Sequence, residues 1–268
     1  MRFQRELTAA VLIPAVVAVL VFAPLWAWAL LVAAAAALAL VEFYRLLEAA
    51  GGSVPKPAGV VLLLALLAAA HLRSPEGLAI AAGATLLVLP TLVLFSSPPV
   101  PALLPSSAGS AFATLYVGLG GSSMIGLRAL GWKPVVFLLA AVWASDSAAY
   151  YVGRRFGKTK LAPVVSPKKT WEGFGGQIAG GLVAGLAAAL ILEGGANIGL
   201  AAAFGAFVAA IAVVGDLLES TFKRSCAVKD SGGLLPGHGG FLDRLDSLLY
   251  ASPVVLLVGT WAPEVMPR

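Results

Sequence analysis

The chain has 268 residues, of which 60% are hydrophobic and only 12% charged, and its mean hydropathy is +0.94. This composition excludes an ordinary soluble domain and indicates a protein that crosses a membrane several times. A single cysteine, Cys226, excludes an internal disulfide and a cysteine-based metal cluster. The basic residues behind the formal charge of +5 lie in short loops between apolar runs, so lipid headgroups and nucleotide phosphates are better partners than nucleic acid.

The apolar runs predict an all-α, polytopic membrane protein with about nine transmembrane helices. Their expected positions are residues 8–23, 25–43, 58–72, 77–95, 111–128, 134–152, 174–192, 197–217 and 247–262. Several are short for a full crossing, which takes about 20 residues. The first run is similar to a signal peptide, but a second run follows almost at once. We therefore expect the two to form a helical hairpin that stays in the membrane.

The basic residues favour one orientation. If the N-terminus lies inside, only four of the 18 Lys and Arg residues face outward: Arg73, Arg128, Lys133 and Arg268. The positive-inside rule then predicts an N-terminus inside and a C-terminus outside. It also predicts that every charged motif faces the cytoplasm, where nucleotides are found.

The first half of the chain carries little chemistry. Glu42 and Arg45 are expected at an inner helix end, where they snorkel or pair. The segment 96–110 contains four prolines and no charge, which predicts a loop rather than a helix. The expected organisation is therefore an N-terminal group of helices with this linker, residues 1–110, and a catalytic region, residues 111–268.

Asp146 lies inside an apolar run of the second half. A carboxylate near the bilayer centre costs about 3 kcal/mol, so we expect it to face the protein interior or a wet cavity. Tyr150 shares its helical face, and Arg154 and Arg155 follow at the inner surface. The alternative is a carboxylate that packs between helices and is hydrogen-bonded to a neighbour.

Residues 166–173 read SPKKTWEG. Ser166-Pro167 predicts the start of a helix, at which Lys168 and Lys169 can reach a phosphate that the helix dipole also attracts. A basic patch on the membrane surface is the alternative. Downstream, glycines spaced four apart at 176/180 and 181/185 predict close helix packing, either within the chain or in a homodimer.

The densest charge lies in residues 216–246. If the preceding apolar run continues as a helix, Asp216, Ser220 and Lys223 share one face, while Asp243 and Asp246 lie one turn apart on a second helix. The glycine-rich segment between them can bring backbone amides close to an anion. Such an arrangement suits a magnesium ion and the phosphates that it bridges. The alternative is an interfacial loop whose charges pair with one another in water.

The same stretch carries a resemblance to a known family. Its pattern is Ser220-x-Phe222-Lys223-Arg224-x4-Lys229-Asp230-x-Gly232-x2-Leu235-Pro236-x-His238-Gly239-Gly240-Phe241-x-Asp243-Arg244-Leu245-Asp246. This pattern resembles, without a departure, the signature of phosphatidate cytidylyltransferases, also called CDP-diacylglycerol synthases. The stretches around Asp146 and around Lys168 are similar to two further elements of that family. The resemblance implies a polytopic fold and a magnesium-dependent reaction of CTP with phosphatidic acid that yields CDP-diacylglycerol and pyrophosphate.

The residues suit this chemistry. A phosphate ester has a second pKa of about 6, so phosphatidate at pH 7 is already an oxyanion and needs no Ser, Cys or His nucleophile. The obstacle is repulsion between two anions, which metal ions and lysines reduce. We expect Asp216 and Asp246, followed by Asp243, to hold Mg²⁺; a second metal or a monovalent cation is left open. Without metal, one of these clustered carboxylates should retain a proton.

The expected site is as follows. The candidate catalytic residues are Asp216, Asp246, Asp243 and Lys223. The candidate substrate-binding residues are Lys168, Lys169, Ser220, Arg224, Lys229, Arg244, Asp146 and Tyr150. His238 can act as a general acid, although a loop role is preferred because pyrophosphate bound to magnesium is already a good leaving group.

Three alternatives stay open from the sequence. A CDP-alcohol phosphotransferase is disfavoured because its Asp-Gly-x2-Ala-Arg element is absent. A lipid kinase and an ion-coupled transporter with Asp146 and Asp216 as cation ligands are the others. A transporter should carry charges along a path to both faces, whereas these motifs gather on one. The expected setting is a bacterial inner membrane, with the active site facing the cytoplasm, CTP and phosphatidic acid as partners, and a homodimer as an option.

Overall fold

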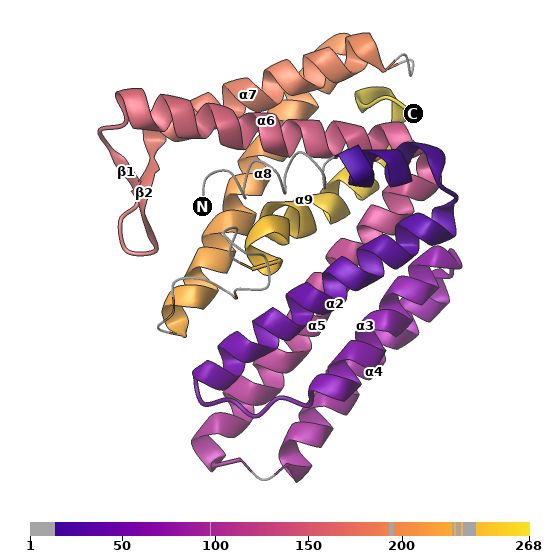
Figure 1. Cartoon of the computed structure of the whole chain (residues 1–268), viewed down its shortest axis with the longest axis vertical. Helices are drawn as coiled ribbons and strands as arrows, with labels where there is room; N and C mark the ends of the chain where they lie inside the picture. The colour runs from indigo at the N-terminus through magenta and orange to yellow at the C-terminus, as the bar shows by residue number, and fades with distance from the viewer. Residues whose placement is uncertain (1–13, 97, 193–195, 227, 229–231, 233–239) are drawn as a thin grey trace. The chain divides into compact units, whose positions relative to one another are not determined.

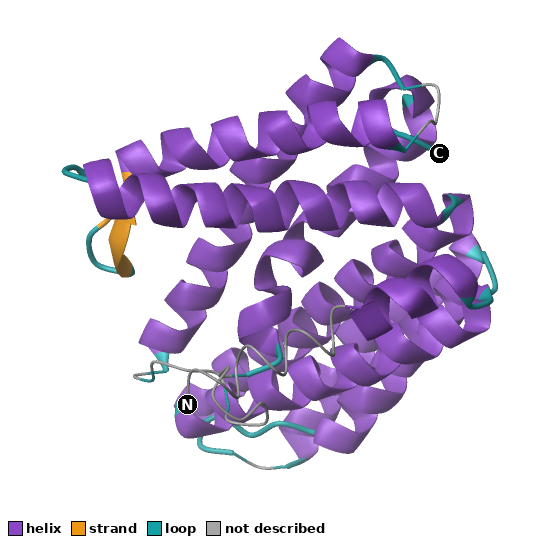
Figure 2. Ribbon diagram, turned by 45° about the horizontal axis from the view of Figure 1, so that its top comes forward, coloured by secondary structure: helices purple, strands orange, loops and turns teal. Residues whose placement is uncertain are grey.

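The structure is a computed structural model that describes residues 14–96, 98–192, 196–226, 228, 232 and 240–268. Within these residues the secondary structure is helical apart from one short β-hairpin, and loops and turns connect the helices (Figures 1 and 2). The helices are α2 (Leu25–Ala49), α3 (Lys56–His71), α4 (Pro75–Phe95), α5 (Val100–Leu130), α6 (Trp132–Phe156), α7 (Trp171–Ile191), α8 (Ile198–Ser225) and α9 (Leu242–Trp261), followed by the 3₁₀ turn η1 (Pro263–Val265). Residues 14–22 are helical as well; the rest of the span predicted at 8–23 lies outside the described residues.

The expectation of a helical integral membrane protein is confirmed. Within the described part of the chain, six helices are long and apolar enough to cross a bilayer: α2, α4, α5, α6, α7 and α8. The apolar helix α3 is shorter, at 16 residues. The count of nine spans and the inward N-terminus stay predictions.

The chain divides into two compact units. The first unit comprises residues 1–126 and 222–245, and the second comprises residues 127–221 and 246–268. The helices α8 and α9 therefore each contribute residues to both units, because the chain passes from one unit to the other within each helix.

In the first unit, buried polar side chains join the apolar helices. The indole of Trp28 in α2 donates to the Met124 carbonyl in α5 at 3.1 Å, and the Ser122 hydroxyl of α5 donates to the Leu66 carbonyl in α3 at 3.2 Å. The hydroxyls of Tyr44 and Thr114 also form a buried hydrogen bond. Such bonds add to van der Waals packing, which is what holds helices together in lipid.

The predicted loop at residues 96–110 is wrong from Val100 onward, because α5 begins there and the expected boundary at residue 110 falls inside it. Pro101 is tolerated at the second helical position, where the backbone N–H has no intrahelical partner in any case. Pro105 removes one hydrogen bond from the helix. The adjacent Ser106 is buried, and its hydroxyl accepts the Ser53 N–H at 2.9 Å.

In the second unit, α6 and α7 run side by side and are joined by a β-hairpin (Figure 1). Its strands are β1 (Lys160–Ala162) and β2 (Ser166–Thr170), paired antiparallel with Lys160 opposite Thr170. The predicted helix start at Ser166 is therefore wrong. The helix α7 starts at Trp171, because the Thr170 hydroxyl accepts the Gly173 N–H at 3.1 Å and so caps it.

The two glycine spacings of α7 serve packing within the chain. Gly176 and Gly180 lie against α6, while Gly181 and Gly185 lie against Gly205 and Ala201 of α8. At each of these four positions the neighbouring helix leaves no room for a β-carbon. The prediction of close helix packing is confirmed, and this packing holds α6, α7 and α8 together around the polar residues described next.

Candidate active site

Residues from four separate elements come together in the second unit. Asp146 of α6, Asp216 of α8, Asp246 of α9 and Lys169 of β2 interact electrostatically with one another. The Lys169 ammonium nitrogen lies 2.6 Å from Oδ2 of Asp216. We call these three carboxylates and this lysine the acidic cluster. Its members come from all three of the motifs that the sequence distinguishes.

Close contact between α8 and α9 brings two of these carboxylates together. A β-carbon at Gly215 would lie 2.9 Å from the Asp246 carbonyl oxygen and 2.8 Å from the Tyr250 β-carbon. The Ser247 hydroxyl donates to the Ala212 carbonyl at 3.1 Å. Because Gly215 lacks a side chain, α8 and α9 can approach closely between Asp216 and Asp246.

The two lysines of β2 differ in their surroundings. Adjacent residues on a strand point to opposite faces, so Lys168 and Lys169 diverge. Lys169 is partly buried against Asp216, whereas Lys168 is exposed. The following Glu172 is half-buried, and its carboxylate accepts the backbone N–H groups of Lys158 and Thr159 at 3.1 and 3.2 Å. Glu172 therefore ties the start of the hairpin to α7.

The sequence analysis missed Gln177 of α7. This residue is only 5% exposed, and its amide nitrogen donates to Oδ1 of Asp146 at 3.2 Å and to the Ala209 carbonyl of α8 at 3.4 Å. Asp146 itself is exposed. The hydrogen bond to a neighbouring helix, which was the alternative interpretation for Asp146, is thus present. A lone amide in a glycine-rich apolar helix was the signal that could have identified Gln177.

Asp246 is the most buried carboxylate of the cluster, and it precedes the apolar part of α9. Burial raises the pKa of Asp246 to about 7, and the negative charge of Asp216 adds to this effect. A carboxyl in this environment holds a proton near neutral pH, and a bound cation would favour its release.

The remaining predicted ligand, Asp243, belongs to the first unit. Its Oδ1 lies 2.6 Å from the Lys223 ammonium, and its Oδ2 accepts the Gly240 N–H at 3.0 Å. The two side chains are only 14% and 13% exposed. Asp243 therefore forms a partly buried ion pair with Lys223 and also accepts a hydrogen bond at the start of α9.

The other predicted residues have simpler environments. The Ser220 hydroxyl donates to Oδ1 of Asp216 at 3.4 Å, and Tyr150 accepts from Arg154 at 3.2 Å. Arg224 donates to the Val228 carbonyl at 3.2 Å, and Arg244 is exposed in the first turn of α9. Lys229 and His238 lie outside the described residues.

A magnesium ion was expected in this region. Within the described residues, no group of three or more His, Cys, Asp or Glu side chains is arranged to hold a metal ion. Asp216 and Asp246 still fit Mg²⁺ by their chemistry, because they are hard oxygen donors set close together in a partly buried place. Mg²⁺ commonly takes one or two protein carboxylates and completes its shell with water and substrate phosphates.

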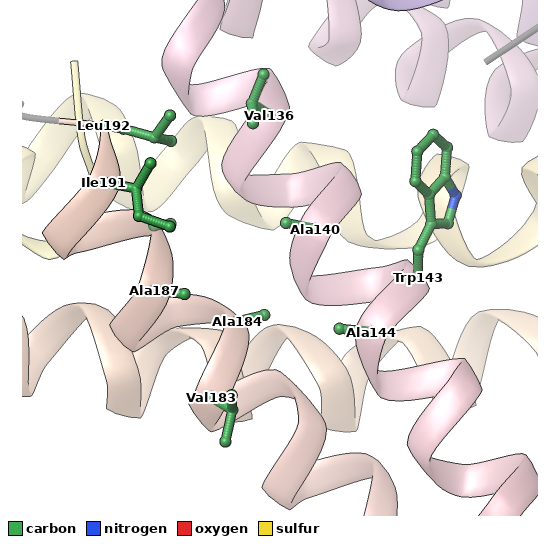
Figure 3. A pocket seen from close by; sticks show the side chains of 10 residues that line it. Val136, Ala140, Trp143, Ala144, Val183, Ala184, Ala187, Ile191 and Leu192 are labelled. Carbon is green, nitrogen blue, oxygen red and sulfur yellow. The ribbon is translucent and has the colours of Figure 1, made fainter. Parts of the chain in front are cut away.

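An apolar hollow of about 480 Å³ lies between α6 and α7 (Figure 3). It is lined by Val136, Ala140, Trp143, Ala144, Val183, Ala184, Ala187, Ala188, Ile191 and Leu192. None of the predicted site residues lines it, and its surface offers contacts to hydrocarbon rather than to charged groups.

The fold and the site define a helical integral membrane protein in which carboxylates and a lysine from distant segments form a polar cluster. The chain belongs to the cytidylyltransferase family, whose sequence model matches residues 3–261. It is 44% identical over 157 residues to a phosphatidate cytidylyltransferase of Haemophilus influenzae, a match that covers 53% of each chain.

Further relatives agree with this assignment. Proteins of the same name from Staphylococcus epidermidis and Brucella suis are each 42% identical over 147 residues. These matches cover 54% of this chain and 56% and 54% of the two relatives. The chain thus spans about half the length of the curated relatives that it matches.

Proposed function

We propose that this protein transfers a cytidylyl group from CTP to phosphatidic acid and so produces CDP-diacylglycerol and pyrophosphate. The observation that carries the proposal is the acidic cluster, in which Asp146, Asp216, Asp246 and Lys169 meet from separate motifs. Membership of the family and the names of the relatives support the same reaction.

The proposed step is an attack by the lipid phosphate. A bond forms between a phosphatidate oxygen and the α-phosphorus of CTP, and the bond from that phosphorus to the bridging β-phosphate oxygen breaks. Pyrophosphate departs with this oxygen. No proton transfer is required, because the lipid phosphate is already ionised at pH 7. The protein must instead hold two anions together in line.

The residues of the cluster take distinct parts in this proposal. Asp216 and Asp246 hold Mg²⁺, which when bound supplies neutralising charge to the phosphates. Lys169, whose ammonium contacts Asp216, adds a positive charge that a triphosphate oxygen can approach. The proposed substrate contacts also include Lys168, Ser220, Arg224, Lys229, Arg244, Asp146 and Tyr150.

The proposal extends to the membrane setting. We place the protein in a bacterial inner membrane with about nine spans, the N-terminus inside and the acidic cluster on the cytoplasmic side. The asymmetry of the basic residues supports this orientation. The catalytic region is expected in residues 111–268, and a homodimer is compatible with the proposal.

The test is the incorporation of labelled CTP into lipid by the purified protein in mixed micelles, with and without phosphatidic acid and magnesium. We expect CDP-lipid only when both are present, and none from Asp216→Asn or Asp246→Asn. Glu264→Gln, a change at an exposed residue of η1, is the matched control and should retain activity. A folded wild-type protein that forms no CDP-lipid would refute the proposal, and cation-driven uptake into liposomes would then test the transporter alternative.

A further inference from the structure

Glu42 lies in the N-terminal half, where no site residue is expected, yet it is completely buried in α2. Of the two environments expected for Glu42, snorkelling or pairing, this burial excludes snorkelling to the membrane surface. A buried carboxylate needs hydrogen bonds to offset its loss of hydration. Its contacts within the first unit show which part of the chain provides them.

The carboxylate of Glu42 contacts the start of α9. Its Oε2 accepts the backbone N–H of Leu242 at 2.9 Å, across 200 positions of sequence. Leu242 is the first residue of α9 and is itself fully buried. The N–H groups of the first helical turn have no acceptor within the helix, and the helix dipole favours a negative charge beside them. Glu42 therefore acts as an N-terminal cap supplied by another helix.

Glu42 also contacts the glycine-rich signature. A β-carbon at Gly232 would lie 2.8 Å from the carboxyl carbon of Glu42 and 3.0 Å from its γ-carbon. The chain can pass this close to Glu42 only because Gly232 has no side chain. Two positions of the signature stretch, Gly232 and Leu242, thus contact a single carboxylate of α2.

The next residue of α2 holds the other end of the same stretch. The ring of Phe43 lies 5.1 Å from that of Phe222 in the last turns of α8, measured between centroids. Phe112 of α5 lies 5.4 Å from the same ring. Phe222 directly precedes Lys223, and Leu242 directly precedes Asp243. Phe43 therefore contacts the residue before Lys223, and Glu42 contacts the residue before Asp243. In this way two adjacent residues of α2 hold both partners of the ion pair in place.

From this geometry we infer that Glu42 is a positioning residue for the active site. It fixes the start of α9 and the place of Asp243 in the first helical turn. Asp246 follows one turn later along the same helix. Glu42 acts from a helix outside the signature and without contact to substrate. The inference rests on the proposed function, because its effect on turnover presupposes that α9 carries active-site carboxylates.

The experiment compares Glu42→Gln, Glu42→Ala and Glu42→Asp in the full-length protein. Glu48→Gln in the same helix is the matched control, because Glu48 pairs with Lys56 at 2.6 Å and is 39% exposed. Hydrogen–deuterium exchange measures the cap directly. We expect Glu42→Ala to raise exchange of the peptide that contains residues 240–245 at least tenfold, with little change in α3 and α4. Glu42→Gln, which retains an acceptor oxygen, should raise it less.

Kinetics provide the second measurement. We expect Glu42→Ala to lower kcat about tenfold or more and to raise the magnesium concentration needed for half-maximal activity, with a smaller change in KM for CTP. Glu42→Gln should change both kcat and the magnesium requirement less than Glu42→Ala does. The Glu48→Gln control should match the wild type in exchange and in turnover.

The outcomes separate this inference from the proposed function. If the wild type makes no CDP-lipid, the reaction is wrong, while the exchange measurement still tests the cap. If Glu42→Ala and Glu42→Gln both behave as Glu48→Gln does, the positioning role is wrong. If both raise exchange throughout α2 to α5, Glu42 stabilises the fold in general and the inference is overturned as well.

Discussion

The acidic cluster and the start of α9 both contain carboxylates of the signature, but these carboxylates have different partners. At the start of α9, Glu42 and Asp243 accept backbone N–H groups, and Lys223 neutralises Asp243. The carboxylates of the acidic cluster also accept hydrogen bonds, and Asp246 accepts the Ser247 N–H at 2.6 Å. The difference lies in the charge, because three carboxylates of this cluster interact with Lys169. A carboxylate whose charge is offset by amides and a lysine stabilises a fold, whereas excess negative charge attracts a further cation. From this comparison we expect a structural role for Asp243, and we keep the catalytic role proposed for Asp216 and Asp246.

The largest effect on activity should follow from removal of a carboxylate in the acidic cluster. We expect Asp216→Asn and Asp246→Asn each to lower kcat/KM at least about 100-fold, because each removes a proposed ligand of the magnesium ion that would neutralise the phosphates. In metal-free buffer, both variants should be as stable as the wild type or more stable, because repulsion among the carboxylates decreases. Activity and thermal unfolding in the same detergent measure the two effects.

This prediction fails in a recognisable way. If Asp246→Asn unfolds at a much lower temperature than the wild type, then Asp246 belongs with the structural carboxylates and the contrast between the two regions disappears. The Glu264→Gln control shows how far an exposed charge alone moves the unfolding temperature.

The second prediction concerns Asp243, where we expect a loss of stability rather than a loss of the magnesium site. Asp243→Asn removes the carboxylate beside the partly buried Lys223. Breaking a fully buried pair destabilises a protein by about 3 kcal/mol, and we expect a smaller cost here because both side chains keep some contact with solvent. We expect a clear loss of unfolding free energy and an unchanged magnesium requirement in the activity that remains. The double variant Lys223→Met/Asp243→Leu should regain much of the stability, because an apolar pair of similar volume can replace a buried ion pair. A magnesium requirement shifted as strongly as in Asp216→Asn would instead identify Asp243 as a metal ligand.

The sequence predicted the helical membrane fold and the helical placement of Asp216 and Asp243 correctly, because long apolar runs and a three- or four-residue spacing are local signals. It failed at the starts of α5 and α7, where proline is compatible with a loop, a strand or a first helical turn. It also missed Gln177 and Glu42. Their partners lie 31 and 200 residues away. A lone amide in an apolar helix could have marked Gln177 as a polar contact, but one sequence alone does not show which distant residue either side chain contacts.

The third prediction concerns the two lysines of β2. Lys169 contacts Asp216, whereas Lys168 is exposed. We expect Lys169→Met to raise KM for CTP about tenfold, because it removes a partly buried charge from the acidic cluster. Lys168→Met should change KM less, since an exposed charge is screened by water and salt. Equal losses in the two variants, measured at one ionic strength, would show that both lysines contact phosphate.

The smallest effect should come from Gln177, which shares no charge with the acidic cluster but holds one of its members. Gln177→Leu removes the bonds to Asp146 and to the Ala209 carbonyl, at a cost of about 1 kcal/mol in unfolding free energy. We expect a severalfold loss of kcat with KM for CTP nearly unchanged, because the amide orients Asp146 without contacting the nucleotide.

The variant Gln177→Glu tests the role of net charge, since it adds a fourth carboxylate to the acidic cluster. If excess negative charge is what attracts a cation, Gln177→Glu should raise the magnesium affinity while Gln177→Leu leaves it unchanged. The opposite order would mean that hydrogen bonding, not net charge, distinguishes the two regions.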